Sequence, residues 1–198
     1  MEAVNQTLFL WINAPERPNI LALTLAIFLA EWLIWAVPVA IGTGWLRGNG
    51  KTRQMMLVAT TSGLVGMLIN QIVGLVWPHP RPFMIGLGHT FIPHVADSSF
   101  PSDHLTLWWA TVFSVLMQQG PRRAWSALAL LGISIAWARI YLGVHFPFDM
   151  LGAAVVAALS AWLTLNAAHW YLPPVYRLAV GMHRILFSRL IRQGWVRE

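Results

Sequence analysis

Residues 100–117 read FPSDHLTLWWATVFSVLM, a polar cluster followed by a continuous apolar run. Serine favours the position just before a helix, so the pattern predicts a helix over Ser102–Met117 that opens with Asp103 and His104. At 1.5 Å per residue this helix is about 24 Å long, shorter than the roughly 30 Å hydrocarbon core of a bilayer. We therefore expect its polar end slightly below the membrane surface, where the free N–H groups of a helix start can bind an anion.

The composition is that of a membrane protein. Hydrophobic residues make up 57% of the 198 residues and charged residues only 10%. Soluble domains carry about 25% charged residues, so this chain could not cover a water-facing surface. The net charge of +6 could by itself suit nucleic acid, but the positive residues lie beside the apolar runs. We expect no nucleic-acid partner. The absence of cysteine excludes disulfides and thiolate metal sites.

About 20 apolar residues span a bilayer as a helix, and the runs here are continuous, without the alternation of barrel strands. The fold class that we predict is an all-α integral membrane bundle of about five to six helices. Its expected spans are Ile20–Leu46, Met55–Trp77, Ser102–Met117, Ala124–Tyr141 and Pro147–Tyr171.

Two flanking segments complete the predicted organisation. Residues 5–14, NQTLFLWINA, are typical of a short helix at the membrane interface. Residues 174–198 alternate arginines with apolar side chains, as in a basic amphipathic helix on an anionic lipid surface. We expect one membrane-embedded domain over 1–173, which includes the amino-terminal interfacial segment, and a tail over 174–198, for which membrane lipids are the expected partners.

The distribution of positive charge predicts the orientation. Lysine and arginine concentrate in the 46–54 loop, the 118–124 loop and the tail. With five spans these regions share one side, which the positive-inside rule makes cytoplasmic. The 78–101 and 142–146 loops then face outward.

The outward side holds the residues suited to chemistry, in three segments: HPRPF (79–83), FPSDH (100–104) and ARIYLGVHFPFD (138–149). Each has a structural alternative, such as Ser102 capping a helix or Arg81 lying in an ordinary loop. Together they are harder to explain in that way, because charged groups at membrane depth are rare and usually functional.

The residue types fit phosphoryl transfer. Arg81 and Arg139 offer planar forks for phosphate oxygens. His145 and Asp149 are spaced i, i+4, so the carboxylate can fix the imidazole tautomer and leave the other nitrogen free to attack. His104 supplies a second imidazole that can protonate a leaving group.

These segments resemble the motifs of the type 2 phosphatidic acid phosphatase superfamily, which includes the vanadium haloperoxidases: K-x6-RP, PSGH and SR-x5-H-x3-D. They occur here as GLVWPHPRP (74–82), PSDH (101–104) and ARIYLGVHFPFD (138–149). The resemblance implies a helical bundle with its site at the membrane surface and no metal or other cofactor. It implies the following roles: phosphate contacts from Arg81, Ser102, the backbone around Asp103, and Arg139; His104 as acid, His145 as nucleophile and Asp149 as its orienting group.

Three positions depart from the motifs. Gly74 stands where the family has lysine, Ala138 replaces a serine, and Asp103 replaces the glycine of PSGH. His79 is a candidate to take over the role of the lysine. Asp103 would repel an anion unless it points away or has a partner.

The PSDH sequence, the preceding HVADSSF (94–100) and the small size most resemble the bacterial undecaprenyl pyrophosphate phosphatases of this superfamily. This resemblance implies an isoprenoid pyrophosphate lipid as substrate and an outward-facing site in the cytoplasmic membrane. The alternatives are a broader lipid phosphate phosphatase, a lipid phosphotransferase on the same scaffold, and a non-catalytic lipid-binding or transport protein.

Three further residues are candidates for supporting roles. Glu31 lies inside the first span, where it can pair with a site arginine, hydrogen-bond across helices near Asn70 and Gln71, or stay protonated in a structural role. His94 and Asp97 could line the entrance. A metal site is disfavoured, since no HxxxH or HExxH spacing occurs. Nothing in the sequence identifies a protein partner.

Overall fold

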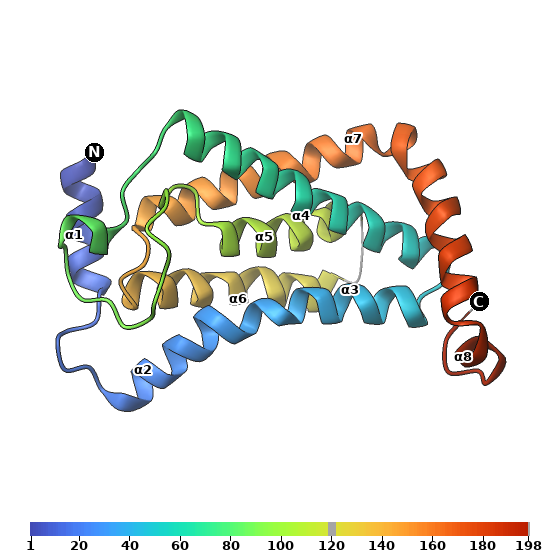
Figure 1. Ribbon diagram of the computed structural model, residues 1–198, viewed down its shortest axis with the longest axis horizontal. Helices are drawn as coiled ribbons and strands as arrows, with labels where there is room; N and C mark the ends of the chain where they lie inside the picture. Colours follow the sequence, from blue (N-terminus) through green and yellow to red (C-terminus); the bar gives the residue numbers. More distant parts are fainter. Residues whose placement is uncertain (119–121, 198) are drawn as a thin grey trace.

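The computed structural model describes residues 1–118 and 122–197 of the chain. These residues form an elongated helical bundle, and no strand occurs among them. Residues 119–121 of the predicted 118–124 loop and Glu198 lie outside the described residues. The amino terminus lies at one end of the bundle and the carboxyl terminus at the other (Figure 1).

The predicted spans are confirmed as helices. Four are long and apolar enough to cross a membrane by length and composition: Ile20–Arg47, Gly50–Val76 (α4), Arg122–Tyr141 (α6) and Pro147–Leu186 (α7). The fifth, α5, covers Asp103–Met117, and its 15 residues give a helix only about 22 Å long.

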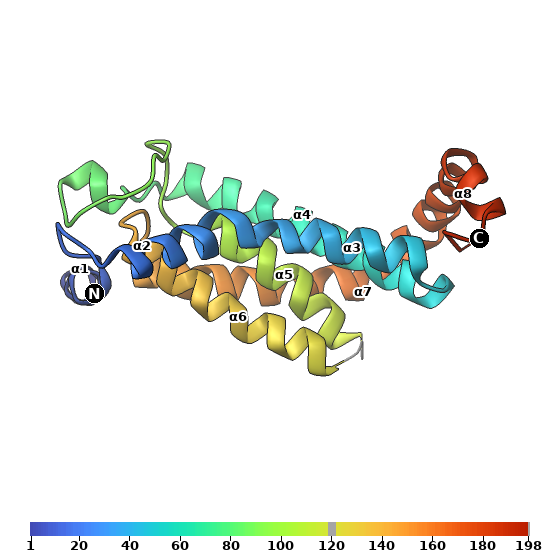
Figure 2. The same ribbon diagram turned by 90° about the horizontal axis from the view of Figure 1, so that it is seen from below.

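The short helix α5 is the centre of the bundle. It packs against α4, α6 and α7, and both views show it enclosed by these neighbours (Figures 1 and 2). Its side chains Leu105, Trp108 and Val112 are almost fully buried in the main apolar core. A short helix held on all sides can keep its polar start below the ends of the surrounding spans.

The first span is less regular than the sequence suggested. It consists of α2 (Ile20–Ile27), a π-helical turn over Phe28–Trp32, a 3₁₀ turn over Leu33–Trp35, and α3 (Ala36–Arg47). Pro38 lacks the N–H that an uninterrupted α-helix would direct at Ile34, which accounts for a rearranged ladder just before α3. The π turn contains Glu31, and such turns often occur at functional sites.

The last span is longer than predicted. α7 continues fifteen residues past Tyr171 to Leu186 and includes Pro173 and Pro174. It bends in its second half and leads to α8, Ser188–Arg192 (Figure 1). The domain boundary that we expected after residue 173 therefore falls at these two prolines, within one helix. It stays a prediction.

Helix α1, Glu2–Ile12, confirms the predicted amino-terminal helix and packs against the loop between α6 and α7. The ring of Phe9 lies edge-on to Phe146 at 5.3 Å between centroids. The Asn5 side chain accepts a hydrogen bond from the N–H of Phe148 at the start of α7. The α1 helix thus closes the bundle end that holds the polar residues.

Candidate active site

A cavity of about 280 Å³ opens at the amino-terminal end of α5. Most of the residues predicted to carry chemistry line it, although they come from four separate segments of the chain. Its polar lining consists of Arg81, His94, Asp97, Asp103, His104, Arg139 and His145, and its apolar lining of Ile34, Met67 and Leu107. The two imidazoles singled out in the sequence therefore share one cavity.

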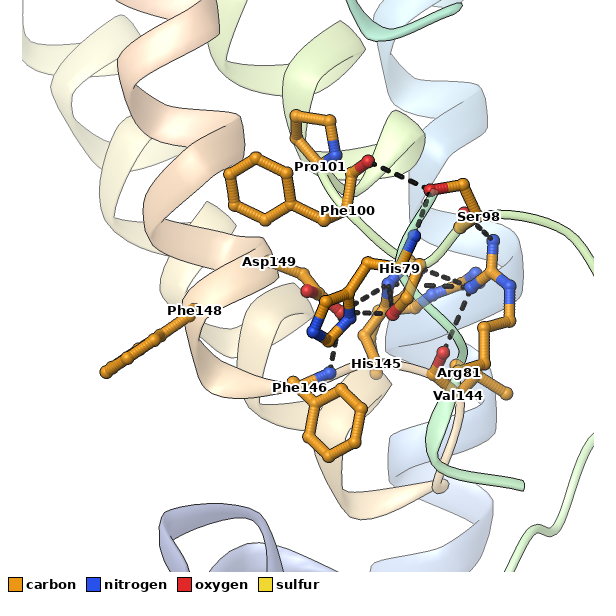
Figure 3. A network of polar contacts seen from close by, with 12 residues as sticks. His79, Arg81, Ser98, Phe100, Pro101, Val144, His145, Phe146, Phe148 and Asp149 are labelled. Carbon is orange, nitrogen blue, oxygen red and sulfur yellow. Dashed lines mark hydrogen bonds and ion pairs between the residues drawn. The ribbon is translucent and has the colours of Figure 1, made fainter. Parts of the chain in front are cut away.

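His145 lies in the loop between α6 and α7 and is held by Asp149 from the first turn of α7. Its Nδ1 is 3.2 Å from Asp149 Oδ2, as the i, i+4 spacing predicted. The same oxygen accepts the backbone N–H of Phe146 at 2.7 Å and the hydroxyl of Ser99. Figure 3 shows Asp149, His145 and Arg81 in a single polar network. Both His145 and Asp149 are almost completely buried, so these bonds are not shared with water.

Arg81 and Asp149 both contact the ring of His145. Arg81 Nη1 lies 3.0 Å from Nε2 and 3.5 Å from Nδ1, which places it over the ring. The tautomer follows from Asp149: its carboxylate accepts from Nδ1, so the ring proton lies on Nδ1 and Nε2 carries the lone pair. Burial, together with the positive charges of Arg139 and Arg81, holds the pKa of His145 well below its ordinary value of 6.5. The imidazole is therefore neutral, with its lone pair on Nε2.

Arg139 lies on the other side of the cavity, near the end of α6. Its Nη1 donates to Glu31 Oε1 at 3.2 Å, which is the arginine pair among the alternatives expected for that glutamate. Its Nη2 lies 2.9 Å from His94 Nε2, and His94 Nδ1 lies 3.2 Å from the carbonyl of Val95. Burial and the charge of Arg81 lower the pKa of His94, so its ring is neutral and accepts from Arg139. The buried Nε of Arg139 has no partner in the protein.

The start of α5 differs from the simple capping alternative. Ser102 occupies the cap position, but its fully buried hydroxyl makes no capping bond and has no partner. Asp103 does have a partner, because Asn70 Nδ2 donates to its Oδ1 at 2.8 Å. This bond holds the Asp103 carboxylate toward α4. The negative charge beside the expected anion site therefore has a partner.

The missing motif lysine leaves space rather than a substitute cation. Gly74 lines a second cavity of about 180 Å³, which shares Asp97 and Asp103 with the first. His79 lines neither of these two cavities: its Nε2 pairs with Glu2 at 3.3 Å and its ring packs on Phe146. The structure thus gives no support to His79 as a replacement for the lysine.

A glycine allows the His145 loop to fit. Gly143 has φ +82°, and a Cβ there would lie 2.1 Å from the carbonyl oxygen of His89. This close approach allows a backbone hydrogen bond between the two segments, in which Phe91 N–H donates to the carbonyl of Leu142 at 3.1 Å. The 78–101 segment and the His145 loop therefore support each other through their backbones.

Sequence reasoning missed Ser99 and Asn5 as supporting residues, and it placed Asn70 near Glu31, whereas Asn70 donates to Asp103. Ser99 is fully buried and its hydroxyl bonds Asp149. A buried serine carries no pattern of its own, but its place in the run SSFPSDH next to the motif was a usable signal. Among the described residues, no group of three or more histidine, aspartate or glutamate side chains is arranged to hold a metal ion.

Comparison with known proteins agrees with this geometry. The profile of the PAP2 superfamily matches residues 54–172. The chain is 37% identical to YbjG of Escherichia coli (strain K12) over 203 residues, covering 100% of both chains. It is 33% identical to undecaprenyl-diphosphatase BcrC of Bacillus subtilis (strain 168), covering 96% of this chain and 97% of BcrC. The crystal structure of Aquifex aeolicus LpxE is similar in fold, with a TM-score of 0.65 and 22% identity over 82% of this chain and 95% of that chain.

Proposed function

The chain belongs to the PAP2 superfamily, and on that premise we propose that it is a multi-pass membrane phosphatase that hydrolyses undecaprenyl pyrophosphate to undecaprenyl phosphate and inorganic phosphate. The observation that carries the proposal is the shared cavity of His145, His104 and two buried arginines in a chain that matches an undecaprenyl-diphosphatase over nearly its whole length.

The chemistry proceeds in two steps. Nε2 of His145 attacks the terminal phosphorus and forms an N–P bond, while the bond from that phosphorus to the bridging oxygen breaks. His104 gives a proton to the departing undecaprenyl phosphate. In the second step a water attacks the phosphohistidine, His104 takes its proton, and the N–P bond breaks to release phosphate.

Charge stabilisation comes from fixed donors. The guanidinium of Arg139 and the hydroxyl of Ser102 are buried at the cavity end of their helices, and each keeps a polar atom without a protein partner. Together with Arg81 and the N–H groups at the start of α5, they suit the three equatorial oxygens of the transferred phosphoryl group. These interactions require no metal ion.

The lipid chain is proposed to leave the cavity through its apolar side. Ile34, Met67 and Leu107, from three different helices, form that side. Because α5 starts below the ends of the longer spans, the head group can reach His104 while the isoprenoid chain stays in the membrane.

The site faces outward in this proposal. Ten of the 13 lysine and arginine residues, all except Arg17, Arg81 and Arg139, lie toward the opposite end of the bundle, which the positive-inside rule makes cytoplasmic. A site on the outer leaflet suits the recycling of a carrier lipid for cell-wall synthesis.

Phosphate release from undecaprenyl pyrophosphate by the purified protein in detergent, with a chelator present, tests the proposal. The wild type should turn over, and His145→Ala should fall to background. A matched control is Ser62→Ala, which removes a fully buried hydroxyl that donates to the carbonyl of Ala110, away from the site.

Different results identify the alternatives. Turnover that requires an added lipid acceptor would indicate a phosphotransferase, and faster hydrolysis of phosphatidate would indicate a broader phosphatase. Lipid binding that survives in His145→Ala without any wild-type turnover would indicate a non-catalytic protein. Loss of activity with the chelator would contradict the metal-independent mechanism.

A further inference from the structure

Each nitrogen of the Arg81 guanidinium has a partner within the protein. Nε donates to Asp97 Oδ1 at 2.8 Å, and Nη2 lies 2.8 Å from the same oxygen in an ion pair. Nη2 also donates to the carbonyl of Ser98 at 3.2 Å. Nη1 donates to the carbonyl of Val144 at 3.0 Å and lies 3.0 Å from His145 Nε2. No nitrogen of the guanidinium is thus left without a protein contact for a phosphate oxygen.

Arg81 can therefore bind a phosphate only in exchange for one of these partners. The carbonyls of Ser98 and Val144 belong to backbone that is itself hydrogen-bonded to its surroundings. The Asp97 side chain is different: it is 56% exposed, whereas that of Arg81 is 5% exposed. Asp97 also lines the cavity. It is the partner that can move into water at the lowest cost.

The other arginine provides the contrast. Arg139 is paired with Glu31 in a similar way, but its buried Nε has no protein partner. A phosphate can thus be bound by Arg139 while the pair with Glu31 stays intact. Of the two arginine–carboxylate pairs, only Arg81–Asp97 therefore competes directly with the ligand for the guanidinium.

The competition extends to the nucleophile. His145 Nε2, which attacks phosphorus in the proposed mechanism, lies 3.0 Å from Arg81 Nη1. A guanidinium that turns toward a phosphate loosens this contact as well. The same movement that exchanges Asp97 for substrate therefore also changes the surroundings of the nucleophile.

We propose that Asp97 is an exchangeable counter-ion of Arg81: a phosphate or pyrophosphate group takes its place on the guanidinium, and its return helps to expel inorganic phosphate. Asp97 is thus a residue that sets phosphate affinity and product release, acting through Arg81. The inference rests on the proposed function only for the identity of the lipid, because the exchange concerns the phosphate group itself.

The test measures the affinity of the purified protein for inorganic phosphate by calorimetry, without lipid substrate, and as competitive inhibition of turnover. Asp97→Asn should bind phosphate up to about fivefold more tightly, because an exposed ion pair contributes up to about 1 kcal/mol and the competitor is removed. Asp97→Ala removes the same charge and should act in the same direction.

Two controls separate this exchange from a general change of charge. Glu16→Gln alters the net charge equally at an exposed position outside the cavity and should leave phosphate affinity unchanged. Glu31→Gln should have a smaller effect than Asp97→Asn, because Arg139 keeps a donor for the ligand.

Weaker or unchanged phosphate binding in both Asp97 variants, with thermal stability retained, would show that Asp97 orients Arg81 and does not compete with the ligand. If Glu16→Gln bound phosphate more tightly to the same extent, the change in net charge alone would explain the effect. Since calorimetry needs no turnover, tighter phosphate binding in a protein that does not hydrolyse undecaprenyl pyrophosphate would uphold the exchange and refute the proposed substrate.

Discussion

Arg81 Nη1 and Asp149 Oδ2 hold the two nitrogens of the His145 ring, at 3.0 Å from Nε2 and 3.2 Å from Nδ1. The carboxylate acceptor at Nδ1 leaves one proton position open to the neutral imidazole. The ring is therefore oriented before any substrate arrives, and the free enzyme needs no proton rearrangement to present Nε2.

Asp149→Asn should reduce phosphate release by about 10²- to 10⁴-fold. The amide keeps the shape of the side chain but removes the charge that holds the proton on Nδ1 and stabilises the ring as phosphorus is attacked. The rate is measured by single-turnover phosphate release, and circular dichroism checks the fold. A folded variant that keeps more than a tenth of the wild-type rate would contradict the assigned role.

Ser99→Ala should lower kcat about 10- to 100-fold with little change in KM, since a hydrogen bond to a buried charged group contributes about 1.5–3 kcal/mol. The Ser99 hydroxyl touches Asp149 and lies 3.4 Å from His145 Nδ1 but does not line the cavity. Ser99→Thr keeps the hydroxyl and should recover most of the rate. Ser62→Ala, which loses a fully buried hydroxyl elsewhere, is the matched control, and an equal effect on kcat there would argue against a positioning role.

Gly143→Ala should destabilise the protein and remove activity. The positive φ alone costs about 1–2 kcal/mol for a residue with a Cβ, and the contact with the carbonyl of His89 requires the His145 loop to move. Thermal unfolding in detergent and phosphate release measure the two effects. Gly42→Ala is the control, because a Cβ at Gly42 meets nothing within 4 Å and lies in a helix. Equal melting temperatures for the two variants would contradict the expected destabilisation by a Cβ at position 143.

The stability of the wild type should fall more steeply than that of His145→Gln as the pH drops below 6.5. Burial lowers the pKa of His145 in the folded state, whereas the unfolded imidazole titrates near 6.5. Below that pH the unfolded state binds a proton that the folded state does not, so acid favours unfolding. Unfolding midpoints from pH 7.5 to 5.0 measure the difference. Parallel curves for the two proteins would mean that His145 has an ordinary pKa.

Much of the fold followed from the apolar runs, because the length of a helix in a membrane is limited by the thickness of the bilayer. The ends of the helices were less certain. α7 passes Pro173 and Pro174, where the sequence suggested a boundary, since a long helix can bend at proline without ending. The π turn at Phe28–Trp32 has no periodic signal and was not foreseen.

The residues of the site followed from local patterns. The spacing of His145 and Asp149 places them together on any helical first turn, and the polar group at Ser102–His104 marks a helix start. Such features depend on neighbours along the chain, so one sequence is enough to identify them.

The sequence by itself thus predicted which residues are candidates for the chemistry, and it determined that they lie on a helical bundle of membrane type. Only the tertiary structure decided their partners: Ser99 beside Asp149, Asn70 beside Asp103, and Asp97 on Arg81. These contacts join segments up to 50 residues apart. Their geometry depends on how the helices pack and how the long 78–101 loop returns over the cavity, and no local spacing encodes that path.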